Sequence, residues 1–337
     1  MQIYTRKKLN SFELSLTYDD ISLVPTEVSE IKSRTQNRTA AEFLGEKINL
    51  PVLSSPMDSV TGIEMADKLG KLGCIGIVNR FDSSLKQLTG SEKYENIRAV
   101  SIGLNADDEL IEKLVEGKYI ICIDTANANN KTVLNKCEDI KRKHDVRIIL
   151  GNVAQGDSLK RLVDAGADAV RIGIGGGSVC STSIQTGIGL GQVSSLLDCY
   201  FSKEKYNLDI ELIADGGIKN PGDVSKAIAL GADVVMLGRM LAGTKEAPGE
   251  VIKYNDQLWK KYRGSASFGV KMKNEFIEGE ETMIPYKGTV ENVINAISDG
   301  LRSAMSYMNC LTLNQLREKD KFVILSYSSF QERLPKK

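Results

Sequence analysis

Histidine is almost missing from this chain of 337 residues, which has only His144, in the polar run KRKHD. That leaves nothing for a histidine-based triad or a histidine-rich metal site, and His144 is expected on a solvated helix. The six cysteines are scattered and form no CxxC pair: Cys74, Cys122, Cys137, Cys180, Cys199 and Cys310. Scattered thiols favour a reducing compartment. We therefore expect a cytoplasmic protein with neither a disulfide framework nor a zinc site.

An excess of charge of one sign is also missing, since 44 Lys and Arg residues balance 44 Asp and Glu residues. With no net charge and no basic block, the sequence predicts no nucleic-acid partner. The first ten residues, MQIYTRKKLN, lack the apolar core of a signal peptide. No run approaches the roughly 18 apolar residues that a membrane span needs, so we expect no membrane association.

The sequence does contain a repeated pattern of short apolar runs, each followed by a helical pattern. The eight runs end at Ser55, Val78, Leu104, Asp124, Val153, Gly175, Gly217 and Gly238. They do not alternate cleanly, which is typical of strands buried on both faces. The amphipathic stretches GDSLKRLVDAG and PGDVSKAIALG each end in a glycine, a common helix C-cap. The sequence therefore predicts an α/β protein, a single (β/α)8 barrel over residues 1–337. The alternative is an open doubly wound sheet, although no GxGxxG follows the first strand.

Polar and glycine residues gather where the predicted strands end, which is where barrels carry their chemistry. The positions are Ser54, Ser55, Asp58, Asn79, Arg80, Asp124, Gly151, Asn152, the range 175–180, Asp215, Gly216, Gly217 and Gly238. ADGG and MLGR close the seventh and eighth runs, where barrels often bind a phosphate through backbone N–H groups. One such glycine alone is more often a turn, but their convergence on one rim favours a phosphate site.

Two segments do not fit a plain barrel. The stretch GIGGGSVCSTSIQTGIG, residues 173–189, surrounds Cys180 with glycines that let backbone N–H groups approach a ligand closely. Cys180 is therefore either a nucleophile or a buried thiol in a flexible loop. Residues 262–288, rich in Gly, Ser and Glu, form either a lid over the barrel mouth or a structureless excursion.

Five motifs then occur in a specific order: LTYDDISLVP, LSSPMDSVT, GIGGGSVCST, IADGGIKNPGDVSKAIALGADVVMLG and YRG…EG…PYKG. In order and spacing the chain resembles the IMP dehydrogenase/GMP reductase family over nearly its whole length. The resemblance implies the same barrel, usually as a homotetramer, with a flap at about residues 262–288. It also implies a purine nucleotide substrate and a nicotinamide cofactor.

The resemblance assigns roles to residues of this sequence. Cys180 would attack C2 of the purine, Thr182 would handle a proton, Glu278 would relay protons, and Arg80 stands at a further catalytic position. The implied substrate-binding residues are Ser55, Ser178, Asp215, Gly216, Gly217, Gly238, Arg239, Tyr262, Gly264 and Ser265, with Asp215 on the ribose and Ser178, Gly217 and Gly238 around the phosphate. The implied cofactor-binding residues are Asp124, Thr125, Ala126, Asn152 and Gly175. A potassium ion on the backbone carbonyls of Gly175, Gly177 and Cys180 is left open.

Within the family, the chain shows features of both branches. Between the second and third runs only FDSSLKQLTGSEKYENI is present, so the CBS pair usual in dehydrogenases is missing. The flap GVKMKNEFIEGEE lacks the Arg-Tyr pair that activates water in dehydrogenases, and IDTANANN is closer to a reductase pattern. These features favour NADPH-dependent reductive deamination of GMP. LAGTKEAPGE, YRG and GLRSAMSY are more similar to an IMP dehydrogenase that uses NAD, and Arg80 stands where reductases usually have a lysine.

Four departures from the family pattern touch the predicted substrate site. Gly176 replaces a usual proline, Ser183 an arginine, Ser265 a methionine and Arg239 a small residue. They fit either a modified purine substrate or a relaxed homologue with the ordinary one. A nucleotide-binding homologue without turnover is a third alternative, but a protein that only binds needs none of Cys180, Thr182 and Glu278.

Overall fold

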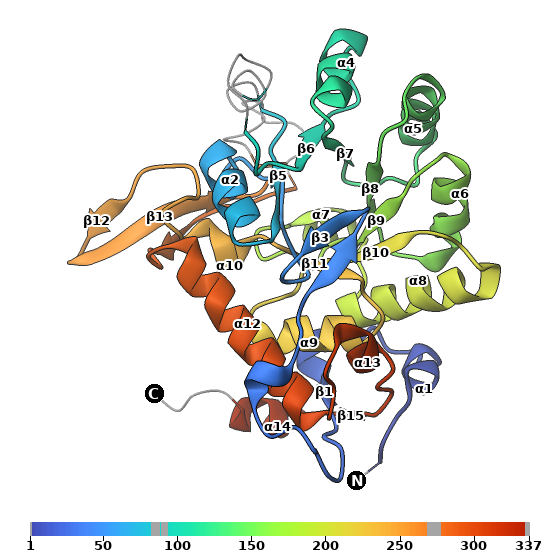
Figure 1. Ribbon diagram of the computed structural model, residues 1–337, viewed down its shortest axis with the longest axis vertical. Coiled ribbons are helices and arrows are strands. Elements are labelled where there is room, and N and C mark those ends of the chain that lie inside the picture. The colour runs from blue at the N-terminus through green and yellow to red at the C-terminus, as the bar shows by residue number, and fades with distance from the viewer. Residues whose placement is uncertain (1, 82–87, 89–93, 268–277, 334–337) are drawn as a thin grey trace.

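The computed structural model describes residues 2–81, 88, 94–267 and 278–333. Eight parallel strands close into a barrel (Figure 1): β4 (Val52–Ser54), β5 (Ile75–Val78), β6 (Ala99–Ile102), β7 (Ile120–Asp124), β8 (Ile148–Val153), β9 (Ala169–Ile172), β10 (Glu211–Asp215) and β11 (Val234–Leu237). The last strand β11 pairs with the first strand β4, which closes the ring. The predicted (β/α)8 barrel is confirmed, and the open doubly wound sheet is wrong.

Burial on both faces explains why the strand sequences do not alternate. Every residue of β5, β6, β9 and β11 is buried. Leu53, Ile77, Ile149 and Ile213 belong to the core cluster inside the barrel, whereas their neighbours along the strands pack under the helices. Both faces of each strand therefore need apolar side chains.

Helices surround the barrel as the sequence pattern predicts (Figure 1). They are α2 (Ile63–Lys71), α4 (Asp108–Glu116), α5 (Lys131–Lys143), α6 (Leu159–Asp164), α8 (Gln192–Tyr206), α9 (Pro221–Ala229), α10 (Arg239–Ala242) and α12 (Val290–Tyr307), with a short α7 (Thr182–Thr186) in the cysteine loop. In α9, the Asn220 side chain caps the first turn and Pro221 occupies the first helical position. His144 directly follows α5 and is half-buried, one residue beyond the helix on which we expected it.

Segments from near the two ends of the chain pair with each other beside the barrel (Figure 1). There, β1 (Ile21–Leu23) pairs antiparallel with β15 (Phe322–Ile324), and α1 (Arg6–Asn10), α13 (Leu313–Arg317) and α14 (Tyr327–Glu332) lie nearby. The motif LTYDDISLVP leads into β1 through a 3-10 turn, Tyr18–Asp20. The Lys226 ammonium of α9 donates to the Tyr18 carbonyl at 2.7 Å, so this motif is fastened to the barrel wall.

A short antiparallel sheet accounts for part of the predicted excursion at 262–288. It consists of β12 (Ile252–Tyr254), β13 (Gln257–Arg263) and β14 (Glu281–Pro285). The described part of the excursion is therefore not structureless, since β14 pairs with β13 over its whole length. Residues 268–277 of the predicted flap, and 82–87 and 89–93 between the second and third barrel strands, lie outside the described residues. Among the helices that are described, none is long and apolar enough to cross a membrane.

A hairpin closes the barrel at the end where the strands begin. Its strands are β2 (Ala41–Phe43) and β3 (Glu46–Ile48), and the fully buried Phe43 packs with the side chains inside the barrel. At the turn, the Leu44 N–H donates to the Glu211 carboxylate at 2.9 Å, while the other Glu211 oxygen is buried without a partner. Burial raises the pKa of Glu211 to about 7.

This buried carboxyl predicts a pH-dependent stability. Because its pKa is higher in the folded chain than in the unfolded chain, Glu211 contributes most to the free energy of unfolding at low pH, and this contribution is lost as pH rises through about 7. We expect Glu211→Gln to remove this fall and to exceed wild type by about 1–2 kcal/mol near pH 8.5, after allowing for the exposed part of the group. Thermal melts at about pH 5 and about pH 8.5 measure the difference. Glu42→Gln, at an exposed position of the same hairpin, is the control; equal pH profiles for wild type and Glu211→Gln would contradict the prediction.

Candidate active site

A cavity of about 330 Å³ opens at the rim where the barrel strands end. It is lined by the predicted residues Ser55, Arg80, Asp124, Thr125, Ala126, Asn152, Gly175, Gly177, Cys180, Thr182, Asp215, Gly216, Tyr262, Gly264, Ser265 and Glu278. Seven further lining residues are not predicted from the sequence: Met57, Arg171, Gly173, Ile174, Val179, Ala266 and Gly279. The sequence motifs therefore converge in space on one cleft.

Cys180 is the thiol that faces this cavity. It follows β9 in the glycine loop, where its N–H donates to the Gly177 carbonyl at 3.0 Å. It is half-buried, whereas the other five cysteines are buried. Burial raises the pKa of Cys74, Cys122 and Cys137 to about 12, so these thiols stay protonated and are inert as nucleophiles. The alternative that Cys180 is a buried structural thiol is wrong.

A chain of hydrogen bonds leads away from the thiol. The Cys180 Sγ donates to Thr182 Oγ1 at 3.2 Å, and that hydroxyl donates to Glu278 Oε2 at 2.8 Å. A hydroxyl can donate and accept at once, so Thr182 can pass a proton between the thiol and the carboxylate. The arrangement of a nucleophile, an intermediate hydroxyl and a carboxylate is suited to covalent catalysis with proton transfer.

Main-chain contacts hold Glu278 beside the cysteine loop. Cys180 and Gly279 form an antiparallel bridge, in which the Ser181 N–H donates to the Glu278 carbonyl and the Glu280 N–H donates to the Val179 carbonyl, both at 2.9 Å. A Cβ on Gly279 would lie 2.8 Å from the Ser267 nitrogen, so only glycine fits there. The backbone, and not only the side chain, therefore fixes the place of this carboxylate.

The base of the flap is fastened to the loop after β4. Arg263, the last residue of β13, donates to the Asp58 carboxylate through Nε at 2.7 Å and also through Nη2. The Ser59 hydroxyl donates to the Arg263 carbonyl and accepts from its N–H, each at 3.1 Å. The YRG motif and the LSSPMDSVT motif therefore bind each other. This contact positions Tyr262, Gly264 and Ser265 on the cavity wall.

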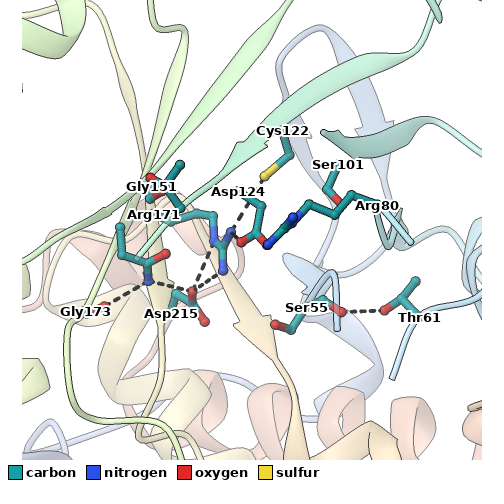
Figure 2. A network of polar contacts seen from close by, with 12 residues as sticks. Ser55, Thr61, Arg80, Ser101, Cys122, Asp124, Gly151, Arg171, Gly173 and Asp215 are labelled. Carbon is teal, nitrogen blue, oxygen red and sulfur yellow. Dashed lines mark hydrogen bonds and ion pairs between the residues drawn. The ribbon is translucent and has the colours of Figure 1, made fainter. Parts of the chain in front are cut away.

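Charged side chains form a network under the cavity (Figure 2). Arg171 of β9 lies between Asp124 at the end of β7 and Asp215 at the end of β10, with N–O distances of 2.7 and 3.0 Å. The Arg80 Nε lies 3.3 Å from the other oxygen of Asp124. Burial lowers the pKa of Arg171, but the two carboxylates outweigh burial and hold this pKa above its ordinary value. Arg171 therefore stays charged at any relevant pH.

Two of the predicted phosphate residues, Ser178 and Gly238, lie next to Tyr262 of the cavity wall. The Ser178 hydroxyl donates to Tyr262 Oη at 3.2 Å, and a Cβ on Gly238 would lie 3.1 Å from the same oxygen. Gly216 and Gly217 have φ of +107° and +74°, which favours glycine, and within the described chain their N–H groups and that of Gly238 have no acceptor. Ser178, Gly217, Gly238 and Arg239 do not line the main cavity. Gly217 instead lines an adjoining cavity of about 320 Å³, and Arg239 is exposed.

The described residues contain no cluster of three or more His, Cys, Asp or Glu side chains that could hold a metal ion. The carbonyls of Gly175, Gly177 and Cys180, which the resemblance offers as ligands of a potassium ion, belong to one short loop. However, the Gly177 carbonyl already accepts from Cys180 and keeps one lone pair for an ion. The residues predicted to bind the nicotinamide cofactor, Asp124, Thr125, Ala126, Asn152 and Gly175, line the same cavity as Cys180.

Comparison with known proteins agrees with this geometry. A family model described as the IMP dehydrogenase/GMP reductase domain matches residues 15–336. The chain belongs to the IMP dehydrogenase/GMP reductase family. Members of this family are oxidoreductases that use NAD(P)H.

Relatives named for both reactions of the family are similar to this chain. The chain is 34% identical to a GMP reductase of Lactobacillus delbrueckii subsp. bulgaricus, over 91% of this chain and 94% of that protein. It is 32% identical to an inosine-5'-monophosphate dehydrogenase of Borreliella burgdorferi, over 95% and 96% of the two chains. An inosine-5'-monophosphate dehydrogenase of Aquifex aeolicus is 37% identical, and there the match covers 80% of this chain but 58% of the relative. Similarity alone therefore leaves the reaction undecided.

The differences in thiol burial predict selective alkylation. We expect iodoacetamide to modify Cys180 in the native protein while the five buried cysteines remain unmodified, because only Cys180 is reached from solvent. Mass spectrometry of peptides after a short reaction identifies the modified site. Cys180→Ala should leave no rapidly modified thiol. Early modification of Cys74 or Cys199 in the folded protein would show that the burial described here is wrong.

Proposed function

We propose that the protein is a GMP reductase, which converts GMP, or a related guanine nucleotide, to IMP and ammonia with NADPH as reductant. The observation that carries the proposal is the continuous path from Cys180 through Thr182 to Glu278 on the cavity wall. The sequence features that favour the reductase branch are the missing Arg-Tyr pair and the missing CBS insertion. Hydrolysis of a covalent intermediate would need the pair, whereas reductive deamination does not.

The residues divide the work at C2 of the purine. Cys180 gives up its proton through Thr182 to Glu278, and its sulfur forms a bond to C2 while the C2=N3 double bond opens. Glu278 returns a proton through Thr182 to the exocyclic amine, the double bond re-forms as the bond from C2 to that amine breaks, and ammonia leaves. When NADPH is bound, it supplies one hydride to C2, the C–S bond breaks, and the thiolate is released. Two protons from solvent complete the balance: one converts ammonia to ammonium, and the other, taken up through Glu278 and Thr182, returns the Cys180 thiolate to the thiol.

The rest of the cleft would hold the nucleotide. Asp215 would accept from the ribose hydroxyls, while Tyr262, Ser178 and the free N–H groups of Gly216, Gly217 and Gly238 would surround the phosphate. Arg239 is exposed next to Gly238, so a bidentate contact to the phosphate requires its guanidinium to turn inward. Asp124 and Asn152 would face the nicotinamide. The family also leads us to expect a potassium ion on the cysteine loop and assembly into a homotetramer. Sedimentation measures the oligomeric state, and a monomer at micromolar concentration would contradict the expected homotetramer.

One observation favours an IMP dehydrogenase that uses NAD as the second candidate. Arg80 lines the cavity and pairs with Asp124 at the position where the reductase pattern has lysine. An arginine stays charged and is a poor proton donor, so it adds nothing to reductive proton transfer. A homologue that binds without turnover is disfavoured, because binding does not require the path from Cys180 to Glu278.

Turnover assays separate these candidates. We expect loss of reduced nicotinamide absorbance and release of ammonia with GMP and NADPH, and no NADH formation with IMP and NAD. Cys180→Ala should abolish turnover and leave the melting temperature unchanged, because the residue faces the cavity. A loss below about tenfold, or about 1.4 kcal/mol, would contradict covalent catalysis. NADH formation from IMP would establish the dehydrogenase, and a screen with dGMP, XMP, modified guanine nucleotides and NADH defines the substrate if GMP is inactive.

The proton route has its own test. We expect Glu278→Gln to lower kcat by at least about a hundredfold, with little change in nucleotide affinity, because the amide keeps the size but cannot exchange the proton. The matched control is Glu280→Gln, an exposed neighbour on the same strand of the bridge. If Glu278→Gln keeps most of kcat, the route through Thr182 is wrong.

A further inference from the structure

Arg171 is an unusual residue for the middle of a barrel strand. It lies in β9 among Ala169, Val170 and Ile172, and 7% of its side chain is exposed. A lone buried cation is costly, so its presence requires partners that compensate it. Figure 2 shows these partners on both sides of the guanidinium, Asp124 on one and Asp215 on the other.

The contacts with Asp215 leave one carboxylate oxygen available. Oδ2 accepts from Arg171 Nε at 3.1 Å, from Arg171 Nη2 at 3.0 Å and from Asn152 Nδ2 at 2.8 Å. Oδ1 has no partner among the described residues, and it is not one of the buried polar atoms without a partner. Since Asp215 lines the cavity, Oδ1 is the oxygen that can accept from a bound molecule. The two guanidinium bonds to the other oxygen fix the rotation that presents it.

The same guanidinium reaches Asp124 with its remaining nitrogen. Arg171 Nη1 donates to Asp124 Oδ1 at 2.7 Å, while Asp124 Oδ2 faces Arg80. Without Arg171, two carboxylates would lie close together in a poorly solvated place and would repel each other. With Arg171, a rotation of either carboxylate is opposed by the bonds that both make to one rigid, planar group.

The backbone around Arg171 leaves it little freedom. A Cβ on Gly151 of the neighbouring strand β8 would lie 2.4 Å from Arg171 Cβ and 3.0 Å from its Cδ. Glycine at this position is therefore what lets the arginine stem pass along the strand toward the two carboxylates. Packing against Gly151 confines the arginine stem, and the two ion pairs orient its guanidinium. Asn152 adds a further bond to Asp215.

We propose that Arg171 is a positioning residue that holds Asp215 toward the ribose of the nucleotide and links it to Asp124 on the nicotinamide side. The inference rests on the proposed function for the identity of the nucleotide. Arg171 acts through the two carboxylates that it binds, Asp215 and Asp124. Its effect is to make recognition of the ribose hydroxyls depend on a carboxylate in the other half of the cleft.

The test measures binding of GMP and of 2'-deoxy-GMP by calorimetry, without NADPH, to wild type, Arg171→Lys, Arg171→Gln and Asp124→Asn. Lysine keeps the charge but cannot bond two carboxylates with a planar fork. We expect Arg171→Lys to weaken the binding of GMP by at least about tenfold, the size expected for one lost hydrogen bond to a charged group. The affinity for 2'-deoxy-GMP should fall by much less. Asp124→Asn should also reduce the preference for GMP over 2'-deoxy-GMP. When Arg171→Lys is already present, adding Asp124→Asn should cause no further reduction. Arg147→Gln, which removes a largely exposed arginine paired with Asp168, is the control.

The outcomes are separable. An unchanged preference for GMP in a folded Arg171→Lys variant overturns the inference. Equal binding of both nucleotides by wild type also overturns it, because Asp215 then does not distinguish the ribose from the deoxyribose. If both Arg171 variants fail to fold, Asp124→Asn alone decides, because it leaves Arg171 and Asp215 in place; an unchanged preference there overturns the link. A wild type that binds GMP with the expected preference but turns over no purine nucleotide contradicts the proposed function and leaves the positioning role supported.

Discussion

Two main-chain hydrogen bonds between the cysteine loop and the flap bring the reacting groups together. Thr182 and Glu278 are 96 positions apart in the chain, and the cost of bringing such distant positions together grows with the separation. The pairing of Val179–Ser181 with Glu278–Glu280 meets this cost with backbone bonds that do not depend on side-chain identity. The contact of Thr182 with Glu278 then needs only the ordering of two side chains. The Gly264 N–H donates to the Glu280 carbonyl at 3.0 Å, which ties the cavity wall after β13 to the same segment.

Much of the architecture could be predicted from the sequence, because parallel barrels leave a strong local signal. Strands buried on both faces read as apolar runs, and the helices between them carry caps such as Asn220 and Pro221. The grouping of Cys180, Thr182 and Glu278 could be predicted from the family motifs alone. Nothing local in the chain indicates that residue 278 lies beside residue 182, since the bridge is a tertiary contact.

The features that could not be predicted from the sequence all depend on contacts between distant parts of the chain. Arg171 is a single charge in an apolar strand, and its meaning depends on Asp124 and Asp215 in two other strands. The lone charge in ADAVRIGIG was nevertheless a signal, because burial of an arginine demands partners. The hairpin of β2 and β3, which closes the barrel where its strands begin, was also not predicted, and neither was the strand β14. These segments are short and gain their stability from packing and pairing rather than from their own sequence pattern.

The pairing of Arg263 with Glu281 affects how the flap can vary among related chains. These two residues hold the described ends of the excursion close together, so the sheet sets the distance that the chain between them must span. Each doubling of the length of such a loop costs only about 0.6 kcal/mol. Glu278 lies three positions before the second anchor, so insertions and deletions earlier in the loop leave its place unchanged. The number of residues before Glu278 can therefore change while its carboxylate keeps its place beside Thr182.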